Sequence, residues 1–383
     1  MSQHTTYDYI ITGAGCAGLS LAMQMIHSGH AASKKILIID KDTKNRNDRT
    51  WCFWEKEVGL FENIVKKQWK QLRFYSATLN RSLDIQPYAY KLIRGIDFYR
   101  HCLSVIHSQP NIEWLQAPVE ALISNESETT VIVDQQKIHA TYIFNSILFD
   151  KPALNDTHHW MLQHFKGWFI KTDKPSFDPE VGTLMDFRTD QKEGATFFYV
   201  LPFTPTEALV EYTLFSPALL DDNQYEKALK NYLSQQLDID SYKVMEKEFG
   251  VIPMTNFAFP QKIHRIINIG TAGGQTKGSS GYTFQFIQKQ AKAITDSLTR
   301  SGHPFTSLSP QKRFQFYDSV LLDVLQKRRV EGWDVFSQLF KKNKGSAVFK
   351  FLDNETNLAE ELQIISTLPT LPFSKAAVWH FMS

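Results

Sequence analysis

Residues 7–40 read YDYIITGAGCAGLSLAMQMIHSGHAASKKILIID and decide the fold. A short apolar strand leads into a glycine turn, an apolar-faced helix and a second apolar strand that ends in Asp40. Gly13 permits the tight turn, Gly15 lets the backbone approach a pyrophosphate, and Gly18 lets the helix pack closely on the strand. The free N–H groups at the helix start attract phosphate, and a carboxylate after the second strand takes a ribose hydroxyl. This context predicts a dinucleotide site rather than a purely structural βαβ unit.

The composition of the 383 residues is that of a globular protein, with 43% hydrophobic and 21% charged side chains. A net charge of +2 gives no strong attraction to nucleic acid, so we expect no nucleic-acid partner. The 28 Phe, 14 Tyr and 8 Trp indicate either a Phe-rich core, which composition alone favours, or an interior built for a large apolar ligand. The three cysteines lack metal-ligand spacing, and His158 and His159 are expected in a solvated loop, so no metal site is predicted.

The sequence contains no run of about 18 apolar residues, which is the length that a membrane-spanning helix needs. Only a few polar residues precede the first strand, so no signal peptide is expected. These two features predict a cytoplasmic protein, or one that binds the cytoplasmic face of a membrane.

A second glycine-rich turn follows a later buried strand. Gly270, Gly273, Gly274 and Gly281 fall between that strand and a predicted helix. They form a second backbone cradle at a helix N-terminus, suited to the ribityl–pyrophosphate side or the ring carbonyls of a flavin. Arg94 begins another predicted helix, where it can reach a pyrophosphate or remain an ordinary surface arginine. Two separated cradles fit FAD better than NAD, which needs one crevice.

The order of strand and helix patterns predicts two domains and a helical end. Strong strand patterns run from His164 to Pro253, with a helix over Tyr225–Leu237, and a buried strand at Arg265–Gly270 returns to the first domain. We expect an α/β fold with a Rossmann-type FAD-binding domain of the two-domain flavoprotein kind, an antiparallel β-sheet substrate domain and a helical C-terminal part. The expected ranges are 1–75, 91–150 and 262–300 for the FAD-binding domain, 76–90 and 151–261 for the substrate domain, and 301–383 for the helical region.

Six segments carry a family resemblance. They are GAGCAG (13–18), RTWCFW (49–54), LIRG (92–95), LMDFR (184–188), LVEYT (209–213) and GTAGGQTKGSSGYTF (270–284). Their order resembles that of the bacterial FAD-dependent lycopene β-cyclases, and RTWCFW and LVEYT are the more specific segments. Many relatives have two acidic residues in the latter, but Tyr212 replaces the second here, which makes a two-acid mechanism doubtful at this position. The usual Gly-Asp of the late flavoprotein strand is also absent, because Thr271 follows Gly270.

Glu211 is the only charged residue in the apolar stretch 208–217. On a strand it shares one face with Leu209, Thr213 and Phe215. A carboxyl among apolar neighbours should have its pKa raised by desolvation, so that it holds a proton near neutral pH. The alternative is an outward-facing glutamate on an edge strand, which the pattern alone favours, whereas the resemblance favours the functional role.

The resemblance implies an acid-initiated cyclisation. Glu211 would protonate C2 at a ψ-end of lycopene, C6 would attack the cation at C1, and loss of the C6 proton would leave a β-ring, giving γ-carotene and then β-carotene. Reduced FAD would stabilise the cation electrostatically without net redox change, and NADPH is a candidate reductant although no second nucleotide motif is evident. Asp186 is a candidate second acid, base or ion-pair partner of Arg188. The deprotonating base stays unassigned.

The expected binding residues follow from these motifs. The expected FAD-binding residues are Gly13, Gly15, Gly18, Asp40, Arg49, Arg94, Gly270, Gly273, Gly274 and Gly281. The expected substrate-binding residues, whose rings would add cation–π stabilisation of roughly 0.5–2 kcal/mol each, are Trp51, Phe53, Trp54 and Tyr212. A long polyene lives in lipid, so we expect peripheral association with the cytoplasmic membrane, with helices around 330–351 as a candidate contact.

Two other functions stay open on the sequence. A FAD-dependent monooxygenase or prenyl reductase acting on an isoprenoid lipid shares every cofactor feature, but it would consume reductant at each turnover. A non-catalytic prenyl-binding carrier of the same fold should lack a complete flavin site. The sequence indicates neither an oligomeric state nor whether one or both ends of lycopene are cyclised.

Overall fold

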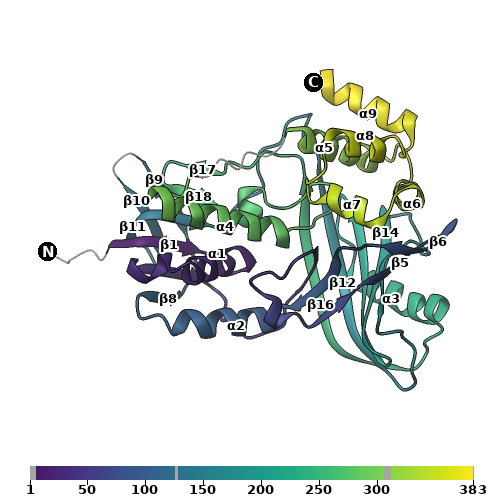
Figure 1. The fold of residues 1–383 in the computed structure, drawn as a ribbon, viewed down its shortest axis with the longest axis horizontal. Helices are drawn as coiled ribbons and strands as arrows, with labels where there is room; N and C mark the ends of the chain where they lie inside the picture. The colour runs from purple at the N-terminus through teal and green to yellow at the C-terminus, as the bar shows by residue number, and fades with distance from the viewer. Residues whose placement is uncertain (1–5, 126–127, 306–311, 383) are drawn as a thin grey trace.

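The computed structural model describes residues 6–125, 128–305 and 312–382. Within these ranges the chain forms one eight-stranded sheet, one seven-stranded sheet and a small three-stranded sheet. In Figure 1 the eight-stranded sheet with its helices lies on the left, and the seven-stranded sheet stands on the right beneath the C-terminal helices. The predicted α/β architecture of two domains with a helical C-terminal part is therefore confirmed.

The eight-stranded sheet contains the Rossmann-type unit predicted from the opening stretch. Its strands are β1 Thr6–Thr12, β2 Ile36–Asp40, β8 Ile112–Gln116, β9 Ala121–Ser124, β10 Thr129–Val133, β11 Gln136–Asn145, β17 Lys262–Ile263 and β18 Ile266–Asn268. The main order is β17-β18-β11-β1-β2-β8, and β9 and β10 extend the sheet from β11. The strands from β18 to β8 pair in parallel, so the turn after β1 lies at the carboxyl edge of the sheet, where this fold class binds nucleotides.

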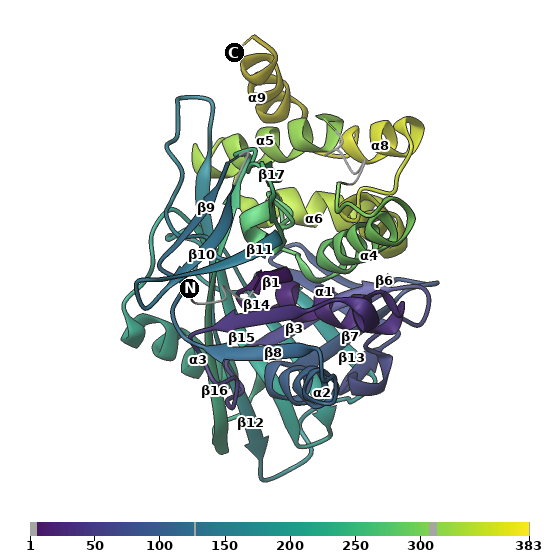
Figure 2. The ribbon, with the colours of Figure 1, turned by 90° about the vertical axis from the view of Figure 1, so that its left-hand side faces the viewer.

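Both faces of this sheet are covered. The helical elements are α1 Cys16–His27, α2 Gly95–His107 and α4 Phe284–Ser301, with the short 3₁₀ helices η1 His30–Ser33, η2 Glu62–Ile64 and η3 Gly270–Gly273. Figure 2 shows β9 and β10 on the side of the sheet opposite α1 and α4. In β2, Ile36 and Ile38 pack toward the helices, whereas Leu37 and Ile39 pack toward β10. Two buried faces explain why β1 and β2 are continuous apolar runs rather than alternating ones.

The seven-stranded sheet is mostly antiparallel. Its strands are β5 Gln71–Ser76, β6 Leu79–Asp84, β12 Trp160–Thr172, β13 Val181–Asp186, β14 Ala195–Thr204, β15 Glu207–Ser216 and β16 Tyr242–Thr255, in the order β16-β12-β15-β14-β13-β5-β6. Helix α3 (Asp222–Leu237) covers one face. Along β15, Leu209 and Phe215 pack on the interior face, whereas Tyr212 and Leu214 pack against α3. This alternation decides which side chains of the LVEYT segment can reach a site between the domains.

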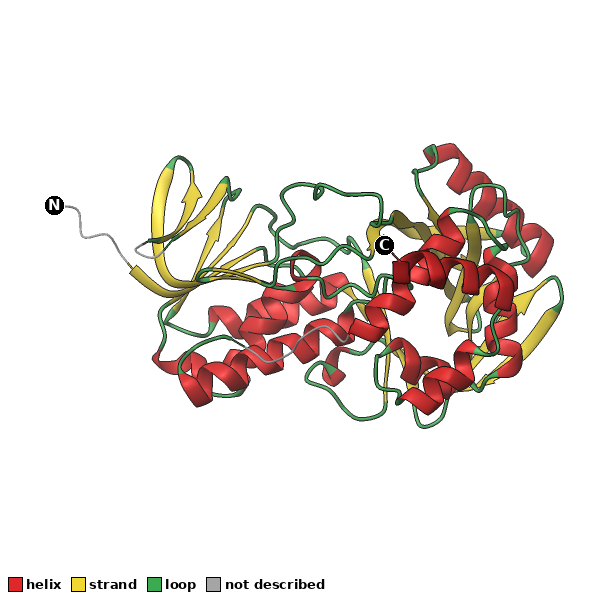
Figure 3. Cartoon of the chain, turned by 90° about the horizontal axis from the view of Figure 1, so that it is seen from above, coloured by secondary structure: helices red, strands yellow, loops and turns green. Residues whose placement is uncertain are grey.

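The small sheet and the C-terminal helices complete the interior face. The small sheet has the order β3-β7-β4, formed by β3 Thr50–Glu55, β7 Ala89–Arg94 and β4 Lys67–Trp69. The C-terminal helices are α5 Lys312–Gln326, α6 Gly332–Lys342, α7 Gly345–Leu352, α8 Leu358–Ile365 and α9 Thr370–Met382. Figure 3 shows them gathered over the second sheet. Phe336 and Phe340 of α6 and Phe349 of α7 are buried there, so α6 and α7 form part of the core and not the membrane contact expected around 330–351.

Several predicted limits shift in the structure. Helix α3 begins at Asp222, earlier than the predicted Tyr225, because Asp221 and Gln224 form a capping box. The chain enters the second sheet at Gln71, before the predicted position 76, since β5 pairs with β13. Positions 1–5, 306–311 and 383 of the predicted regions lie outside the described residues. Across the described chain, no helix combines the length and apolar character needed to cross a bilayer.

The packing of α3 on the second sheet can be tested with Leu229, which is fully buried between them. Replacing it with alanine leaves a cavity, and we expect Leu229→Ala to lower the free energy of unfolding by about 2–5 kcal/mol. The neighbouring Lys230 is exposed, and Lys230→Ala should change the free energy of unfolding by less than about 0.5 kcal/mol. Denaturant unfolding measures both variants, and equal stability of the two would contradict the packing described.

Candidate active site

A cavity of about 430 Å³ lies where the two domains meet. It is lined by the start of α1, by β3, by β15 and β16, and by parts of the glycine-rich segment 270–284. We call it the interdomain cavity. The predicted site residues that line it are Gly15, Arg49, Trp51, Glu211, Gly270 and Gly281. Both nucleotide cradles and the predicted acid, which are far apart in the sequence, therefore face one space.

The opening glycine turn has the geometry that a pyrophosphate needs. Gly13 has φ +87°, a backbone conformation that favours glycine. A Cβ on Gly15 would meet no atom within 4 Å, whereas one on Gly18 would lie 2.0 Å from the carbonyl oxygen of Gly13. The start of α1 has no side-chain cap and no acidic residue in its first turn. An anion therefore fits in the open space beside Gly15, against free N–H groups of the helix.

The second cradle contributes two of its four predicted glycines to the cavity. Gly270 and Gly281 line it, with φ of +59° and +71°. Gly273 permits close backbone packing, because a Cβ there would lie 2.2 Å from the carbonyl oxygen of Asn268. Gly274 has φ +73° and lines a neighbouring cavity. The segment is therefore shaped by left-handed turns that hold α4 with its N-terminal end toward the interdomain cavity.

Asp40 lies at the end of β2, as predicted, and is buried. Its carboxylate accepts a hydrogen bond of 2.6 Å from the backbone N–H of Ala14 and forms an ion pair of 3.1 Å with Lys44. These contacts fix the glycine turn against the second strand. A ribose hydroxyl would share a carboxylate that already has partners, and the ribose role stays a prediction.

The two predicted arginines lie in different places. Arg49 lines the interdomain cavity, and its guanidinium is 3.0 Å from the carboxylate of Asp48. Arg94 pairs with Asp97 at 2.8 Å and lies in a separate shallow depression beside Glu246. The structure therefore brings Arg49, and not Arg94, to the cradle, and Arg94 has the ordinary surface role that the sequence left open.

Glu211 projects from β15 into the interdomain cavity, between β12 and β14. It accepts a hydrogen bond of 2.7 Å from the hydroxyl of Thr213. Burial, and after it the negative charge of Glu248, raises the pKa of Glu211 to about 8, while the Thr213 hydrogen bond acts in the opposite direction. The carboxyl predicted from the sequence thus holds a proton at neutral pH.

Glu248 is a site residue that the sequence analysis missed. It lies on β16, is 4% exposed, and accepts a hydrogen bond of 2.6 Å from the hydroxyl of Thr50 on β3. Burial raises its pKa to about 7, against the opposing effect of the Thr50 hydrogen bond. Glu248 follows Glu246 and Lys247 in a charged run that reads as a solvated strand, and the one signal is that an apolar run begins directly after it.

Asp186 and Tyr212 lie behind the second sheet. Asp186 is fully buried, 2.6 Å from the guanidinium of Arg188, and accepts a hydrogen bond of 2.7 Å from the hydroxyl of Tyr232 on α3. Tyr212 packs on Phe198 in the same layer, with ring centroids 4.8 Å apart. Of the roles considered for Asp186, this geometry favours the structural ion pair, and it places Tyr212 away from the interdomain cavity.

The aromatic residues of β3 divide between two faces because strand side chains alternate. Trp51 lines the interdomain cavity, whereas Phe53 is buried in the core of the first domain, stacked on Phe284 at 4.2 Å. Trp54 faces the second domain, stacks on Phe349 at 4.2 Å and donates a hydrogen bond of 2.8 Å to Asp353. The structure therefore supports a substrate contact for Trp51 and Trp54 and a core role for Phe53.

A second cavity, of about 330 Å³, continues from the interdomain cavity beneath the C-terminal helices. The two share Tyr199, Ser280 and Tyr282 in their linings. Trp54 and Phe215 line it, together with residues of α5 to α9. We call it the apolar cavity, because aromatic and aliphatic side chains make up most of its wall. The interdomain cavity, which Glu211 lines, thus adjoins a space suited to an apolar molecule.

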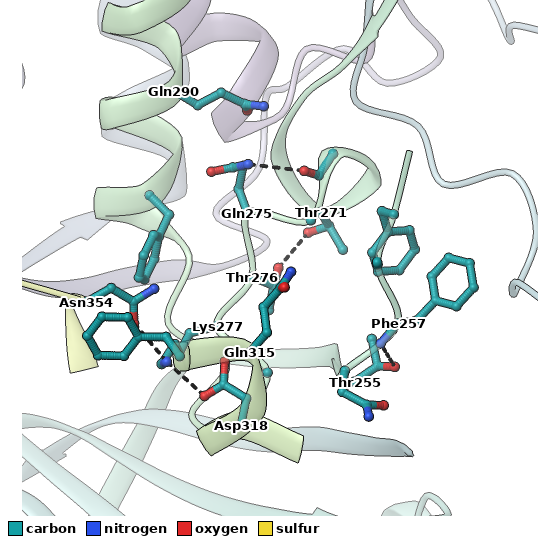
Figure 4. A pocket seen from close by; sticks show the side chains of 18 of the residues that line it. Thr255, Phe257, Thr271, Gln275, Thr276, Lys277, Gln290, Gln315, Asp318 and Asn354 are labelled. Atoms are coloured by element: carbon teal, nitrogen blue, oxygen red, sulfur yellow. Dashed lines mark hydrogen bonds and ion pairs between the residues drawn. The ribbon is translucent and has the colours of Figure 1, made fainter. Parts of the chain in front are cut away.

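A third cavity, of about 390 Å³, adjoins the interdomain cavity and shares Pro253 and Thr271 with it. Figure 4 shows Lys277 between the side chains of Asp318 and Asn354, with nitrogen–oxygen distances of 2.8 Å to each. The lysine is buried and its charge is balanced by Asp318. These contacts make Lys277 a structural link between the glycine-rich segment and the C-terminal helices.

His159 is buried, which corrects the expectation of a solvated loop. Its ring nitrogens lie 2.7 Å from the side-chain oxygen of Gln326 and 3.0 Å from His380 on α9. Asp323 is near enough for the three groups to hold a metal ion, but Lys327 and Arg329 pair with that carboxylate. Two cations beside the only acidic ligand of this trio disfavour a metal, and the histidines join α9 to the second sheet instead.

Comparison with known proteins agrees with this geometry. The family model described as "Lycopene cyclase protein" matches residues 8–378. A lycopene beta-cyclase from Paracoccus sp. (strain N81106 / MBIC 01143) is 24% identical over 97% of this chain and 96% of its own length. A chromoplastic capsanthin/capsorubin synthase from Citrus sinensis is 25% identical over 78% of this chain, and the match spans 61% of the plant protein, less than two thirds of its length.

The fold is that of two-domain FAD-dependent oxidoreductases and monooxygenases. The structure of a probable FAD-dependent monooxygenase from Pseudomonas aeruginosa aligns with a TM-score of 0.57 and 13% identity, covering 85% of this chain and 98% of that one. At this identity the alignment supports the fold and not the reaction. The family model spans nearly the whole described chain, and on that ground the protein is a member of the lycopene cyclase family.

Proposed function

We propose that this chain is a lycopene β-cyclase that converts the ψ-ends of lycopene into β-rings. The observation that carries the proposal is Glu211, a carboxyl with a raised pKa that lines the interdomain cavity, whose wall shares Tyr199, Ser280 and Tyr282 with the apolar cavity. An acid that is protonated at neutral pH, in a cavity that adjoins an apolar one, fits the protonation of an alkene. The family membership supports a carotenoid as the substrate class.

The residues around the interdomain cavity fit FAD. The opening turn and the start of α1 would hold the pyrophosphate, and Arg49, Gly270 and Gly281 would lie along the ribityl chain and the ring. When bound in its reduced anionic form, FAD supplies a fixed negative charge beside the cavity and undergoes no net redox change. NADPH remains a candidate reductant.

The chemical steps assigned to this chain's residues are as follows. Glu211 donates its proton to C2 of the substrate, so that its O–H bond breaks, a C2–H bond forms and a cation develops at C1. The C5=C6 double bond attacks C1 and closes the ring, which moves the cation to C5, and the proton on C6 then passes to a base that stays unassigned as the C5=C6 bond of the β-ring forms. One proton is taken up and one released, which makes the reaction an isomerisation.

The remaining part of the polyene would lie in the apolar cavity. Tyr199 and Tyr282 form part of the wall that the two cavities share, and Trp54 lines the apolar cavity beside them. Aromatic faces there would stabilise a nearby cation by roughly 0.5–2 kcal/mol each. Closure of the cavity by the C-terminal helices would exclude water, which would otherwise capture the cation.

We further propose that the protein binds the cytoplasmic membrane peripherally through α8 and α9. Leu362, Leu371 and Phe381 are 65%, 75% and 85% exposed, although α9 also lines the apolar cavity. One side of α9 thus faces the substrate space while apolar side chains on the helix face outward. This arrangement supports entry of the polyene from lipid at this end of the molecule.

The direct experiment is expression of the chain in cells that accumulate lycopene, followed by pigment analysis with deuterated water in the medium. β-Carotene with solvent deuterium at ring carbon C2 supports the proposal. Oxygenated or saturated carotenoids would indicate a monooxygenase or a prenyl reductase, and unchanged lycopene bound to a flavin-free protein would indicate a carrier.

The role of Glu211 is tested with Glu211→Gln, which keeps the shape of the side chain and removes its proton. We expect the rate of cyclisation to fall by about 10²-fold or more, because general acids contribute factors of this size. FAD binding should be retained. The matched control is Glu207→Gln, because Glu207 lies on the same strand but is partly exposed and paired with Lys171. Its rate of cyclisation should be close to that of wild type. Near-normal cyclisation by Glu211→Gln would show that the proton comes from elsewhere.

Two variants of the glycine turn can separate an effect on FAD binding from an effect on folding stability. In the cofactor-free protein a methyl at Gly15 meets nothing, so Gly15→Ala should leave thermal stability unchanged while weakening FAD binding, because the methyl occupies the phosphate space. Gly18→Ala places a methyl 2.0 Å from a backbone oxygen and should also lower stability, by about 1–3 kcal/mol. Thermal unfolding without FAD and a fluorescence titration with FAD measure the two effects. Unchanged FAD affinity in Gly15→Ala would contradict this cradle.

The apolar cavity can be narrowed from α9. Ser374 lines it, and Lys375 is exposed and does not. We expect Ser374→Trp to reduce lycopene turnover on the order of tenfold by displacing the chain, with unchanged FAD binding, whereas Lys375→Trp should stay near wild type. Assays with lycopene in liposomes compare the two. Equal activity of both variants would place the polyene outside this cavity.

A further inference from the structure

The register of the second sheet brings Glu211 and Glu248 to the same opening. Gly167 on β12 pairs with Glu211 on one side and with Glu248 on the other. Directly paired residues on neighbouring strands share a face, and strands lie about 4.8 Å apart. The two carboxylates therefore flank a position that has no side chain. A Cβ on Gly167 would lie 2.9 Å from both Cγ and Oε1 of Glu248, so the side chain of Glu248 occupies the gap that the glycine leaves.

The hydrogen bonds of the two carboxylates leave one oxygen without a donor. Glu248 Oε2 accepts from Thr50, and Glu211 Oε1 accepts from Thr213. Glu248 Oε1 is buried and has no hydrogen-bond partner among the described residues. A buried carboxylate oxygen without a donor costs about 1–3 kcal/mol or more. A proton carried by Glu211 would supply the missing donor and remove the repulsion between two adjacent negative charges.

The groups that surround this pair do not compensate a second negative charge. Cys52 on β3, Tyr90 on β7, Tyr199 on β14 and Tyr282 are neutral, since burial raises the pKa of each well above neutral pH. The nearby charges of Glu246 and Asp48 are negative and raise the pKa of Glu248 further, and Lys247 pairs with Glu226. The guanidinium of Arg49 lines the same cavity and is paired with Asp48.

We propose that Glu211 and Glu248 form an acid–carboxylate pair that shares one proton, in which Glu248 is the positioning residue that keeps this proton on Glu211. The inference rests on the proposed function, because it assigns the pair to the protonation step. Glu248 accepts from the O–H of Glu211 in the resting site. When Glu211 gives its proton to C2 of the substrate, both carboxylates are negative and face the cation. After ring closure the C6 proton passes to a base that stays unassigned, and the pair takes one proton back from water once the product has left.

This pair has a definite consequence for pH dependence. Activity needs protonated Glu211, so it is present at low and neutral pH and is lost as pH rises through the pKa of Glu211, near 8. Glu248→Gln removes the neighbouring negative charge, so that the pKa of Glu211 falls and the loss of activity occurs at lower pH. A shift of about two units would reduce activity at pH 7 by about tenfold and leave activity at pH 5 near wild type.

A second variant moves the midpoint in the opposite direction. Thr50→Val removes the hydroxyl that stabilises the charged form of Glu248. Glu248 then competes more strongly for the shared proton, the pair becomes harder to deprotonate, and the activity loss should move to higher pH. Glu207→Gln on β15 is the control and should leave the midpoint unchanged. Opposite shifts for the two variants are not expected from a general loss of stability.

Infrared difference spectroscopy of the FAD-free protein tests the pair without activity. Wild type should show the C=O band of a protonated carboxyl at pH 7, and this band should disappear near pH 8. In Glu248→Gln the band should disappear at lower pH. In Glu211→Gln the band of Glu211 should be missing. If the pH midpoint of this band is the same in wild type, Glu248→Gln and Thr50→Val, the proposed pair is overturned, even if the protein cyclises lycopene. A shared proton in a protein that forms no cyclic carotenoid would instead support the pair and overturn the proposed function.

Discussion

A half-buried carboxyl group, that of Glu211 in the cavity where the two domains meet, is the constraint on which the site depends. Burial alone makes the charged form of Glu211 unfavourable, and Glu248 beside it adds repulsion. A carboxyl whose pKa is raised in the folded state destabilises the fold as pH rises from its usual pKa toward the raised one, by about 1.4 kcal/mol per pH unit. The protein tolerates this because the interior face of the second sheet, covered by α5 to α8, forms an extended aromatic core.

The general architecture was predictable because its signals are local. The glycine turn, the apolar runs of β1 and β2 and the second glycine segment each reflect a backbone requirement within a few residues, and the structure places them at one cavity. Glu211 was singled out as a lone charge in an apolar strand, but the pattern alone favoured an outward-facing glutamate, and only the resemblance favoured the site. The alternation that places Leu209 and Phe215 on its face is as expected from strand geometry.

The remaining parts of the site depend on tertiary pairing, which spacing does not reveal. Glu248 belongs to the site because β12 separates it from Glu211 by a glycine, a relation between three strands distant in sequence. Asp186 has apolar sequence neighbours, as Glu211 does, yet its side chain faces α3 and pairs with an arginine. In β3 the aromatic residues are adjacent in sequence and divide between two cores. Tyr212, at the position where many relatives have a second acid, points behind the sheet, and the carboxylate that neighbours Glu211 comes from another strand.

A raised pKa makes Glu211 a weaker acid in the resting site, which is at first sight unsuited to the proposed protonation of an alkene. The relevant comparison is with the state in which the proton has moved. In the resting site the charged form of Glu211 would face Glu248 and apolar walls, whereas after the proposed transfer it would face a carbocation within the same water-poor cavity. The burial that penalises the isolated carboxylate strengthens its attraction to the cation, because charges interact more strongly where water is excluded. The same desolvation therefore keeps the proton available at neutral pH and stabilises the ion pair that its transfer creates.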